Sequence, residues 1–389
     1  MTAVGHSSVS SLFGKKGQVG VNRGVAEFHA GRPVLVTSAD EALLTLPVEG
    51  LDQQRLAEFR KLCAPAQPQL VITAPRALAL GLGATTPVAL PLTADMDVGI
   101  ILALVADAKI DREIDAKTVG AAAAAAIQLV KLSQGLPAVL VADFARSAMA
   151  ASADIVTVEA DAIARFRDEI IHSLKIANKA SVPLTSGQRA CFYVFRDAMG
   201  GSQVAVVVGA PDFSEPVLVR LHSACLTGDV FGSRRCDCGD QLKLALKQLE
   251  ERGGGIVLYL AQEGRGLGLA NKMRTYRMQD EGLDTVDANT TLGFDDDERD
   301  YGMAARMLQM LNCNRVVLLT NNPAKLDGLA KSGIEIVGRI PLEAPINSDN
   351  HRYLAAKVAR AGHLLNHPLA HMPEEDEEDR VASRLSADT

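Results

Sequence analysis

CLTGDVFGSRRCDCGDQ, residues 225–241, is the stretch that most constrains the architecture of the second half of the chain. It holds three of the six cysteines, with ten residues between Cys225 and Cys236 and one between Cys236 and Cys238. Thiolates are soft ligands that suit zinc, and a C-x-C pair can bind one ion if a turn aims both sulfurs the same way. Asp237 and Gly239 tolerate such a turn. The spacing therefore predicts a metal site.

The number of thiols leaves three interpretations open. Three thiolates leave the fourth position of a tetrahedral zinc ion to water, as in a catalytic site. A closed structural site could instead be completed by His222, three residues before Cys225. The three thiols could also be unrelated buried residues. The other cysteines are expected in the core: Cys63, Cys191 and Cys313.

The composition is that of an ordinary globular protein, with 48% hydrophobic and 22% charged residues, and 389 residues fit two domains. Six cysteines in this length disfavour a disulfide framework. The longest apolar run, VGIILALVA from Val98, is too short to span a bilayer, and the start has no apolar signal core. We therefore expect a cytoplasmic protein that has no membrane partner. The net charge of −7 disfavours nucleic-acid binding.

Strand and helix patterns divide the chain into five parts. Residues 1–20 are expected to be a flexible leader, and short apolar strands then alternate with helical stretches over an α/β domain at 21–155. A helical connector follows at 156–180. Residues 181–366 form a second domain of strands and helices, and the acidic tail 367–389 is expected to be disordered. The predicted fold class is α/β (α+β) with two domains, and the second is a mixed sheet with flanking helices.

Three further motifs follow the cysteines. The stretch QEGRGLGLANK comes after an apparent strand, and its glycines let backbone amides approach a phosphate or a ring, although ordinary tight turns use the same residues. The charged run in LGFDDDERDYG is in most proteins a solvated helix start. LLTNNPAK ends a strand at a polar turn and places Lys325 in the first turn of a helix, which suits an anion.

Together these motifs identify a family. RLHSACLTGD, RCDCGDQL, QEGRGLGLANK, DERD and LLTNNPAK occur in the order and approximate spacing of GTP cyclohydrolase II, which the chain resembles over roughly residues 180–366. The resemblance implies a homodimeric enzyme of riboflavin biosynthesis with one zinc per subunit, held by Cys225, Cys236 and Cys238. Members of that family open the imidazole ring of GTP, release formate and pyrophosphate, and leave 2,5-diamino-6-(5-phosphoribosylamino)pyrimidin-4-one.

The resemblance also assigns catalytic residues. Asp297 corresponds to the proton acceptor and Tyr276 to a helper near the purine. Arg299 is similar to the residue regarded as nucleophile in the phosphoryl step. A guanidinium stays protonated in proteins and is a poor nucleophile, so clamping the departing pyrophosphate is the more conservative role for Arg299.

Substrate contacts carry over by the same motifs. Arg220, Arg265 and Lys325 are expected to bind the triphosphate together with magnesium, because a charge of about −4 needs several cations. Glu263 can accept the amino and ring N–H groups of guanine, which would distinguish it from adenine. The full set implied for the nucleotide is Arg220, Leu221, His222, Ser223, Ala224, Gln241, Glu263, Gly264, Arg265, Thr285, Thr320 and Lys325.

Two positions depart from the family pattern. Ala224 stands where the family usually has Glu, and Arg235 stands where it has an apolar residue. These departures keep open a paralogue that acts on another nucleotide or stops at an earlier product. A separate alternative is a non-catalytic, zinc-stabilised nucleotide-binding module.

The first domain faintly resembles 3,4-dihydroxy-2-butanone 4-phosphate synthase through AEFHAGRPVLVTSADEALLTL. The acidic loop that would hold magnesium in that enzyme is reduced to Asp40 and Glu41, and no histidine lies between His29 and His172. We therefore expect residues 21–155 to be a degenerate relative with a structural or dimer-stabilising role and without butanone-phosphate synthase activity.

Overall fold

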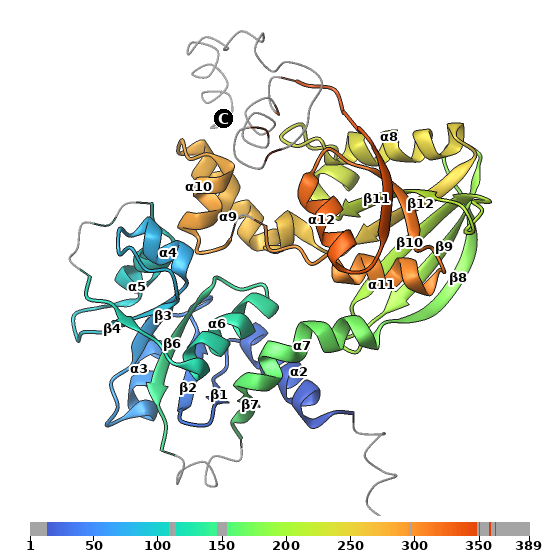
Figure 1. Cartoon of the computed structure of the whole chain (residues 1–389). Coiled ribbons are helices and arrows are strands. Elements are labelled where there is room, and N and C mark those ends of the chain that lie inside the picture. Colours follow the sequence, from blue (N-terminus) through green and yellow to red (C-terminus); the bar gives the residue numbers. More distant parts are fainter. Residues whose placement is uncertain are drawn as a thin grey trace, which may run out of the picture. The chain divides into compact units, whose positions relative to one another are not determined.

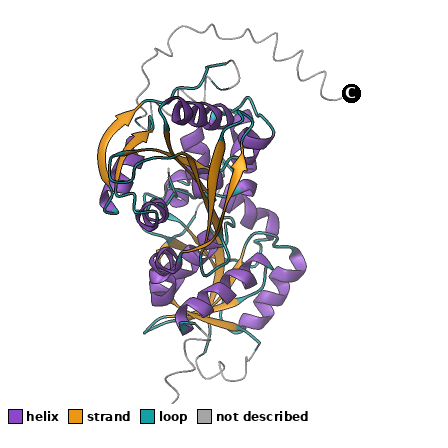
Figure 2. Ribbon diagram, turned by 90° about the vertical axis from the view of Figure 1, so that its right-hand side faces the viewer, coloured by secondary structure: helices purple, strands orange, loops and turns teal. Residues whose placement is uncertain are grey.

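The computed structural model describes residues 14–108, 110, 114–145, 154–295, 297–347, 350, 358 and 362. The acidic tail predicted at 367–389 and most of the predicted leader lie outside these residues. Figure 1 shows the order of the elements along the chain, and Figure 2 separates their strands from their helices. Among the described residues, no helix is both long enough and apolar enough to cross a membrane.

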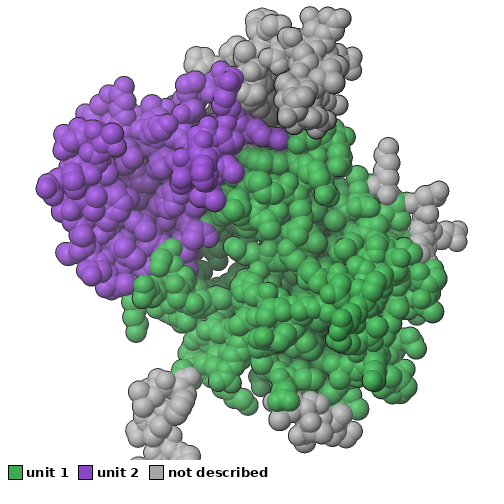
Figure 3. All heavy atoms as spheres, turned by 180° about the vertical axis from the view of Figure 1, so that it is seen from behind, with its two compact units in different colours: residues 1–175, 196–202, 262–300 green, residues 176–195, 203–261, 301–389 purple. Residues whose placement is uncertain are grey.

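The chain divides into two compact units, coloured separately in Figure 3. The first comprises residues 1–175, 196–202 and 262–300, and the second comprises 176–195, 203–261 and 301–389. Residues 262–300 therefore group in space with the N-terminal part of the chain, although the motifs that they carry were predicted within the domain 181–366. The two units are defined by contacts in space and combine separate stretches of the chain. They therefore do not test the domain boundaries predicted along the sequence.

The first unit is built on a seven-stranded sheet with the order β5-β4-β3-β6-β2-β1-β7. The β1–β7 pair is parallel, while the other pairs of this sheet are antiparallel. Its strands are β1 (Val34–Thr37), β2 (Ala42–Pro47), β3 (Gln69–Ile72), β4 (Val88–Pro91), β5 (Lys117–Thr118), β6 (Ala138–Asp143) and β7 (Val156–Glu159). Its helices are α2 (Lys16–His29), α3 (Gln53–Cys63), α4 (Ala74–Ala79), α5 (Val98–Ala106), α6 (Ala121–Leu132), α7 (Ala160–Ser173), the 3-10 turn η3 (Glu263–Gly266), α9 (Leu269–Asp280) and α10 (Thr285–Thr291).

The alanine run forms the first half of α6, which packs against α2 and α7. Ala122 and Ala126 are fully buried, since a methyl group lets neighbouring elements approach closely. The connector predicted as helical over 156–180 is helical only in α7. Its first residues form β7, which pairs with β1, and its last residues begin β8.

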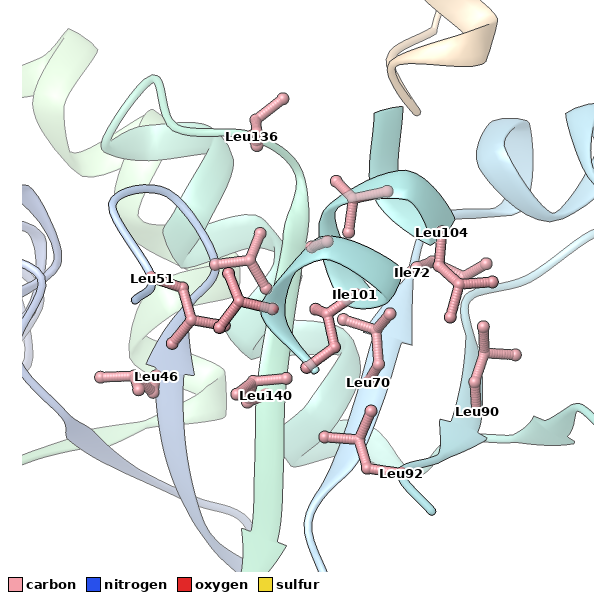
Figure 4. Close-up of a cluster of buried hydrophobic side chains, with 14 of the residues drawn as sticks. Leu46, Leu51, Leu70, Ile72, Leu90, Leu92, Ile101, Leu104, Leu136 and Leu140 are labelled. Carbon is pink, nitrogen blue, oxygen red and sulfur yellow. The ribbon is translucent and has the colours of Figure 1, made fainter. Parts of the chain in front are cut away.

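The core of the first unit includes residues from distant parts of the sequence. Figure 4 shows part of this cluster, including Leu70, Ile72 and Leu140 from the sheet. The same cluster contains side chains contributed by the segment 262–300, namely Leu267, Met278, Ala288, Leu292 and Phe294. The segment is thus an integral part of the core of this unit.

The second unit contains a seven-stranded sheet with the order β14-β13-β11-β12-β10-β9-β8. The strands β14, β13, β11 and β12 are parallel neighbours, while β10 pairs antiparallel with β12, which confirms the predicted mixed sheet with flanking helices. Its strands are β8 (Lys175–Pro183), β9 (Arg189–Arg196), β10 (Ser202–Gly209), β11 (Val217–Ser223), β12 (Gly254–Leu260), β13 (Arg315–Leu319) and β14 (Glu335–Ile340). Its helices are the π-helical turn η2 (Leu226–Val230), α8 (Cys238–Glu251), α11 (Gly302–Met310) and α12 (Pro323–Lys331).

The parallel strands of the second unit indicate where a ligand site can form, because their carboxyl ends lie at one edge of the sheet. β11 and β13 are parallel neighbours, so the residues that follow their carboxyl ends lie at one edge of the sheet. This edge is where ligands bind in open α/β sheets. Cys225 follows β11, and Thr320 follows β13.

Candidate metal centre and nucleotide-binding residues

The three predicted thiols meet in the second unit. The sulfurs of Cys225, Cys236 and Cys238 lie within 4.8 Å of one another, and the Sγ atoms of Cys225 and Cys236 are 3.7 Å apart. Two sulfurs bound at about 2.3 Å to one tetrahedral ion would be ~3.8 Å apart, so the spacing fits zinc. Within the described residues, this is the one group of three or more candidate ligands.

A glycine makes room for the three sulfurs. The N–H of Gly228, in η2, donates to Cys225 Sγ at 3.4 Å. A Cβ at this position would lie 2.9 Å from Cys236 Sγ and 3.1 Å from Cys225 Sγ. Gly239 lets α8 start against this turn, since its own Cβ would lie 2.3 Å from the Gly228 carbonyl oxygen. Gly239 was recognisable from the sequence, whereas the role of Gly228 was not.

His222 does not join the sulfur group. Its Nε2 lies 3.0 Å from each carboxylate oxygen of Asp229, and its ring stacks on Tyr259 with 5.5 Å between centroids. Burial lowers the pKa of His222 and outweighs the hydrogen bond to Asp229, which acts in the opposite direction. The geometry therefore favours the three-thiolate site over a closed site completed by His222.

Asp229 connects this histidine to the first thiol. Its carboxylate accepts hydrogen bonds from the Tyr259 hydroxyl at 2.9 Å and from the Cys225 N–H at 3.0 Å. The side chain of Asp229 is 4% exposed, so these bonds are shielded from water. Asp229 thus holds the backbone of Cys225 to both β11 and β12. No motif in the sequence pointed to it.

The thiol pKa values are raised both in the cluster and in the buried, isolated cysteines, but the cause differs. Hydrogen bonds that the Cys238 thiol makes to Cys225 and Cys236, together with burial, raise the pKa of Cys238 well above its ordinary value. Thiols in a metal site release their protons when the ion binds. Burial alone raises the pKa of Cys63 to about 12 and of Cys313 to about 11, which makes them inert core thiols as predicted. Cys191 is half-buried rather than buried.

Two buried cations lie in the same unit as the sulfurs. Arg220, on β11, donates to the Leu319 carbonyl at 3.0 Å and to the side chain of Gln241. Lys325, on α12, donates to the Leu221 carbonyl at 2.7 Å. Both cations are less than a tenth exposed. They are positively charged groups held near the ends of parallel strands, which is a suitable setting for an anionic ligand.

The remaining predicted residues of this unit have mainly backbone roles. The side chain of Leu221 is buried in the core, and the Ala224 N–H donates to the Leu260 carbonyl at 2.8 Å. The Thr320 hydroxyl accepts from the Asn322 N–H at 3.0 Å and shapes the turn into α12. Ser223 ends β11, two residues before Cys225.

The glycine-rich turn lies in the first unit. Gly264 and Arg265 both have positive φ values, 59° and 63°, so the backbone of η3 is left-handed at these two residues. Glu263 accepts from the Gly264 N–H at 3.0 Å and from Lys272 Nζ at 2.9 Å. Lys272 also lies 5.7 Å from the ring centroid of Tyr276. Lys272 therefore links two predicted site residues, and no signal in the sequence singled it out.

The predicted catalytic pair also lies in the first unit. Arg299 donates through Nε to Asp297 Oδ1 at 2.7 Å and through a second nitrogen to Asp297 Oδ2, so the contact is bidentate. Burial tends to raise the pKa of Asp297, but the hydrogen bonds and charge of Arg299 outweigh it and hold the pKa below its ordinary value. Thr285 begins α10 and accepts from Gln279 at 3.1 Å.

The predicted residues thus fall into two groups, each brought together within one unit. The second unit contains Arg220, Leu221, His222, Ser223, Ala224, Cys225, Cys236, Cys238, Gln241, Thr320 and Lys325. The first unit contains Glu263, Gly264, Arg265, Tyr276, Thr285, Asp297 and Arg299.

Comparisons with known proteins bear on both groups. The family model described as GTP cyclohydrolase II matches residues 175–341. A GTP cyclohydrolase-2 of Azospirillum brasilense is 47% identical over 251 residues, which cover 63% of this chain and 65% of that protein. A riboflavin biosynthesis protein RibBA of Bacillus cytotoxicus is 56% identical over 163 residues, covering 42% of this chain and 41% of that protein.

One solved structure resembles the chain only at low similarity. It is RibBX of A. baumannii, described as a two-domain 3,4-dihydroxy-2-butanone 4-phosphate synthase, with a TM-score of 0.32 and 14% identity over 84% of this chain and 99% of that chain.

A match over most of the chain comes from a GTP cyclohydrolase-2 of Xylella fastidiosa strain Temecula1. It is 38% identical over 362 residues, which cover 91% of this chain and 89% of that protein. The predicted site residues of both units fall in the part of the chain where the family model matches. The chain belongs to the GTP cyclohydrolase II family.

Proposed function

We propose that the protein is a zinc-dependent enzyme that opens the imidazole ring of GTP, releases formate and pyrophosphate, and forms 2,5-diamino-6-(5-phosphoribosylamino)pyrimidin-4-one for riboflavin biosynthesis. The observation that carries the proposal is the sulfur group of Cys225, Cys236 and Cys238 within 4.8 Å, in a chain of this family. These residues would hold one zinc ion. When bound, zinc supplies a water of lowered pKa as the nucleophile for carbon 8 of guanine.

The substrate is bound by buried cations and by one acceptor. Arg220 and Lys325 each donate to a carbonyl oxygen of the second unit, which supports a role in orienting the triphosphate. The family resemblance adds Arg265 and a magnesium ion to this role. Glu263, held by Lys272, would accept the amino and ring N–H groups of guanine. Ala224 contributes its backbone to the sheet, so the absence of the usual Glu side chain there is compatible with the family reaction.

The Asp297–Arg299 pair would act as a unit. Because Arg299 keeps the pKa of Asp297 low, the carboxylate is a weak base while the pair is intact. When Arg299 turns to the departing pyrophosphate, its hydrogen bonds and charge no longer hold the pKa of Asp297 down, so the basicity of Asp297 rises even though the charge of Arg265 still lowers that pKa. Asp297 would then accept a proton near the purine, with Tyr276 as the neighbouring helper. Arg299 thus serves as a phosphate clamp rather than as a nucleophile.

The test is turnover by the purified full chain with zinc, magnesium and GTP. We expect stoichiometric formate and pyrophosphate, together with the ultraviolet change of the pyrimidine product. Cys225→Ser should lose bound zinc and formate release, whereas Cys191→Ser, a cysteine outside the cluster, should retain both. GTP binding without formate release would contradict the proposal and favour a non-catalytic nucleotide-binding module. Turnover of a different nucleotide alone would favour the paralogue.

We also propose that residues 21–155 lack butanone-phosphate synthase activity. Glu41, one of the two acidic residues left in the corresponding loop, accepts from the Ala122 N–H at 2.9 Å and so caps the start of α6. Asp40 is exposed, and neither residue joins a group of candidate metal ligands among the described residues. Turnover of ribulose 5-phosphate by the full chain would contradict this proposal. The homodimer expected from the family stays a prediction.

A further inference from the structure

The catalytic segment of the first unit is anchored by residues that precede it by well over a hundred positions. Thr73 donates to the Gly293 carbonyl at 2.6 Å, and Arg76 donates to the Thr291 carbonyl at 2.8 Å. Asn271, which is fully buried, donates to the Gln134 carbonyl at 3.0 Å. Together with the shared hydrophobic core, these bonds fix α9 and α10 against the N-terminal sheet.

One ion pair extends this anchoring to the catalytic loop itself. Lys131, in the last turn of α6, lies with its Nζ 2.5 Å from Glu298 Oε1 and 3.2 Å from Asp295 Oδ2. The side chains of Lys131 and Glu298 are only 7% and 10% exposed. A pair this buried resists rearrangement, because moving either partner away leaves a charge without compensation in a dry site.

Glu298 connects the ion pair to the backbone of both site motifs. Its Oε1 also accepts from the Asp295 N–H at 3.1 Å, and its own N–H donates to the Arg265 carbonyl at 3.1 Å. Glu298 stands between Asp297 and Arg299 in the sequence. Restraining the position of Glu298 therefore also restrains the backbone of Asp297 and of Arg299. The ion pair therefore sets how the loop lies against the glycine-rich turn.

From this arrangement, and resting on the function proposed above, we propose that Lys131 is a positioning residue for the Asp297–Arg299 pair, acting through Glu298. The degenerate N-terminal region would then have a specific role, because it supplies from α6 the cation that orders the catalytic loop. Lys131 touches neither substrate nor metal in this proposal.

The experiment compares single and paired substitutions in the full, zinc-loaded chain. Lys131→Met should lower kcat for formate release about 10- to 100-fold, the loss expected when a catalytic group is displaced by about 1 Å. The KM for GTP and the zinc content should stay close to those of the wild type. The thermal midpoint should fall, because Glu298 is left buried without its cation, so kcat is compared at a temperature at which both proteins are folded. Lys131→Arg should restore most of kcat, because a guanidinium can pair with the same carboxylate.

Two controls make the result specific. Glu298→Gln should lower kcat by a similar factor, and combining it with Lys131→Met should add little, since both changes remove one interaction. Lys15→Met removes an exposed lysine that pairs with Glu169 at 3.5 Å, away from the catalytic segment, and should leave kcat unchanged. A kcat within twofold of the wild type in Lys131→Met, or additive losses in the double variant, would overturn the proposal.

A second readout separates this inference from the proposed function. If the wild type releases no formate, the function fails, but hydrogen exchange at residues 297–300 still reports the order of the loop. Exchange there should be faster in Lys131→Met than in the wild type and unchanged in Lys15→Met. Equal exchange rates in all three proteins would refute the positioning role, whatever the activity.

Discussion

Replacing Gly228 by Ala tests whether the three sulfurs surround a metal. The added Cβ would lie 2.9 Å from Cys236 Sγ, whereas the contact optimum is at least about 3.5 Å, so an atom must move by ~0.6 Å. Ligand distances in a zinc site tolerate only about 0.2 Å. Overpacking of this kind costs about 1–3 kcal/mol, which corresponds to roughly a 5- to 150-fold weaker zinc affinity. Gly228 has no positive φ, so Ala strains only the packing against the sulfurs.

The assay is competition for zinc with a chromophoric chelator, accompanied by the thiolate-to-metal absorption of the cobalt-substituted protein. Gly20→Ala is the matched control, since it also adds a methyl group to a helical glycine but its Cβ would lie 3.6 Å from its nearest neighbour. We expect the control to bind zinc like the wild type. A cobalt-substituted wild type without thiolate-to-metal absorption would refute the three-sulfur site, whereas wild-type zinc affinity in Gly228→Ala would refute the packing argument for Gly228.

Three further predictions test the surroundings of the site. Asp229→Asn weakens the hydrogen bond that holds the Cys225 backbone. Zinc affinity, measured by chelator competition, should fall about 10- to 100-fold, as is typical for groups that orient a metal ligand. An unchanged affinity would argue against this role of Asp229. Arg76→Met removes the donor for four carbonyl groups, at ~1 kcal/mol each, and should lower the free energy of unfolding in urea by about 4 kcal/mol; a loss below about 1 kcal/mol would contradict it. In the wild type, the lowered pKa of Asp297 contributes stability that is present above the unfolded value of about 3.9 and is lost as pH falls through the folded pKa. Arg299→Met should remove this contribution, so its thermal midpoint should differ from that of the wild type more at pH 7 than at pH 3, and a constant difference would count against the pair.

The clustering of the three cysteines could be predicted from the sequence because the cluster is local. Cys225, Cys236 and Cys238 are close in the chain, and one turn with a helix start is enough to bring them together. The mixed sheet could also be predicted, since the apolar runs of β10, β11 and β12 each show what a buried strand requires.

The residues that were missed act on partners that the sequence does not place. Asp229 looks like an ordinary turn residue until β12 brings Tyr259 against it. Gly228 looks like a flexible glycine until the three cysteines surround it. Lys131 stands in a helix with no motif, and its partner Glu298 is 167 positions away. Such contacts depend on tertiary packing, which single-sequence patterns do not encode.

The grouping of residues 262–300 with the N-terminal part of the chain gives a physical reason to retain a domain that we propose has no activity of its own. Leu267, Met278, Leu292 and Phe294 are each at most 3% exposed, and the cluster that buries them is built largely by the N-terminal sheet and its helices. Without that cluster these side chains would form an exposed apolar patch, which soluble proteins avoid. Residues 21–155 therefore help to bury the segment 262–300, whether or not any chemistry remains in the domain.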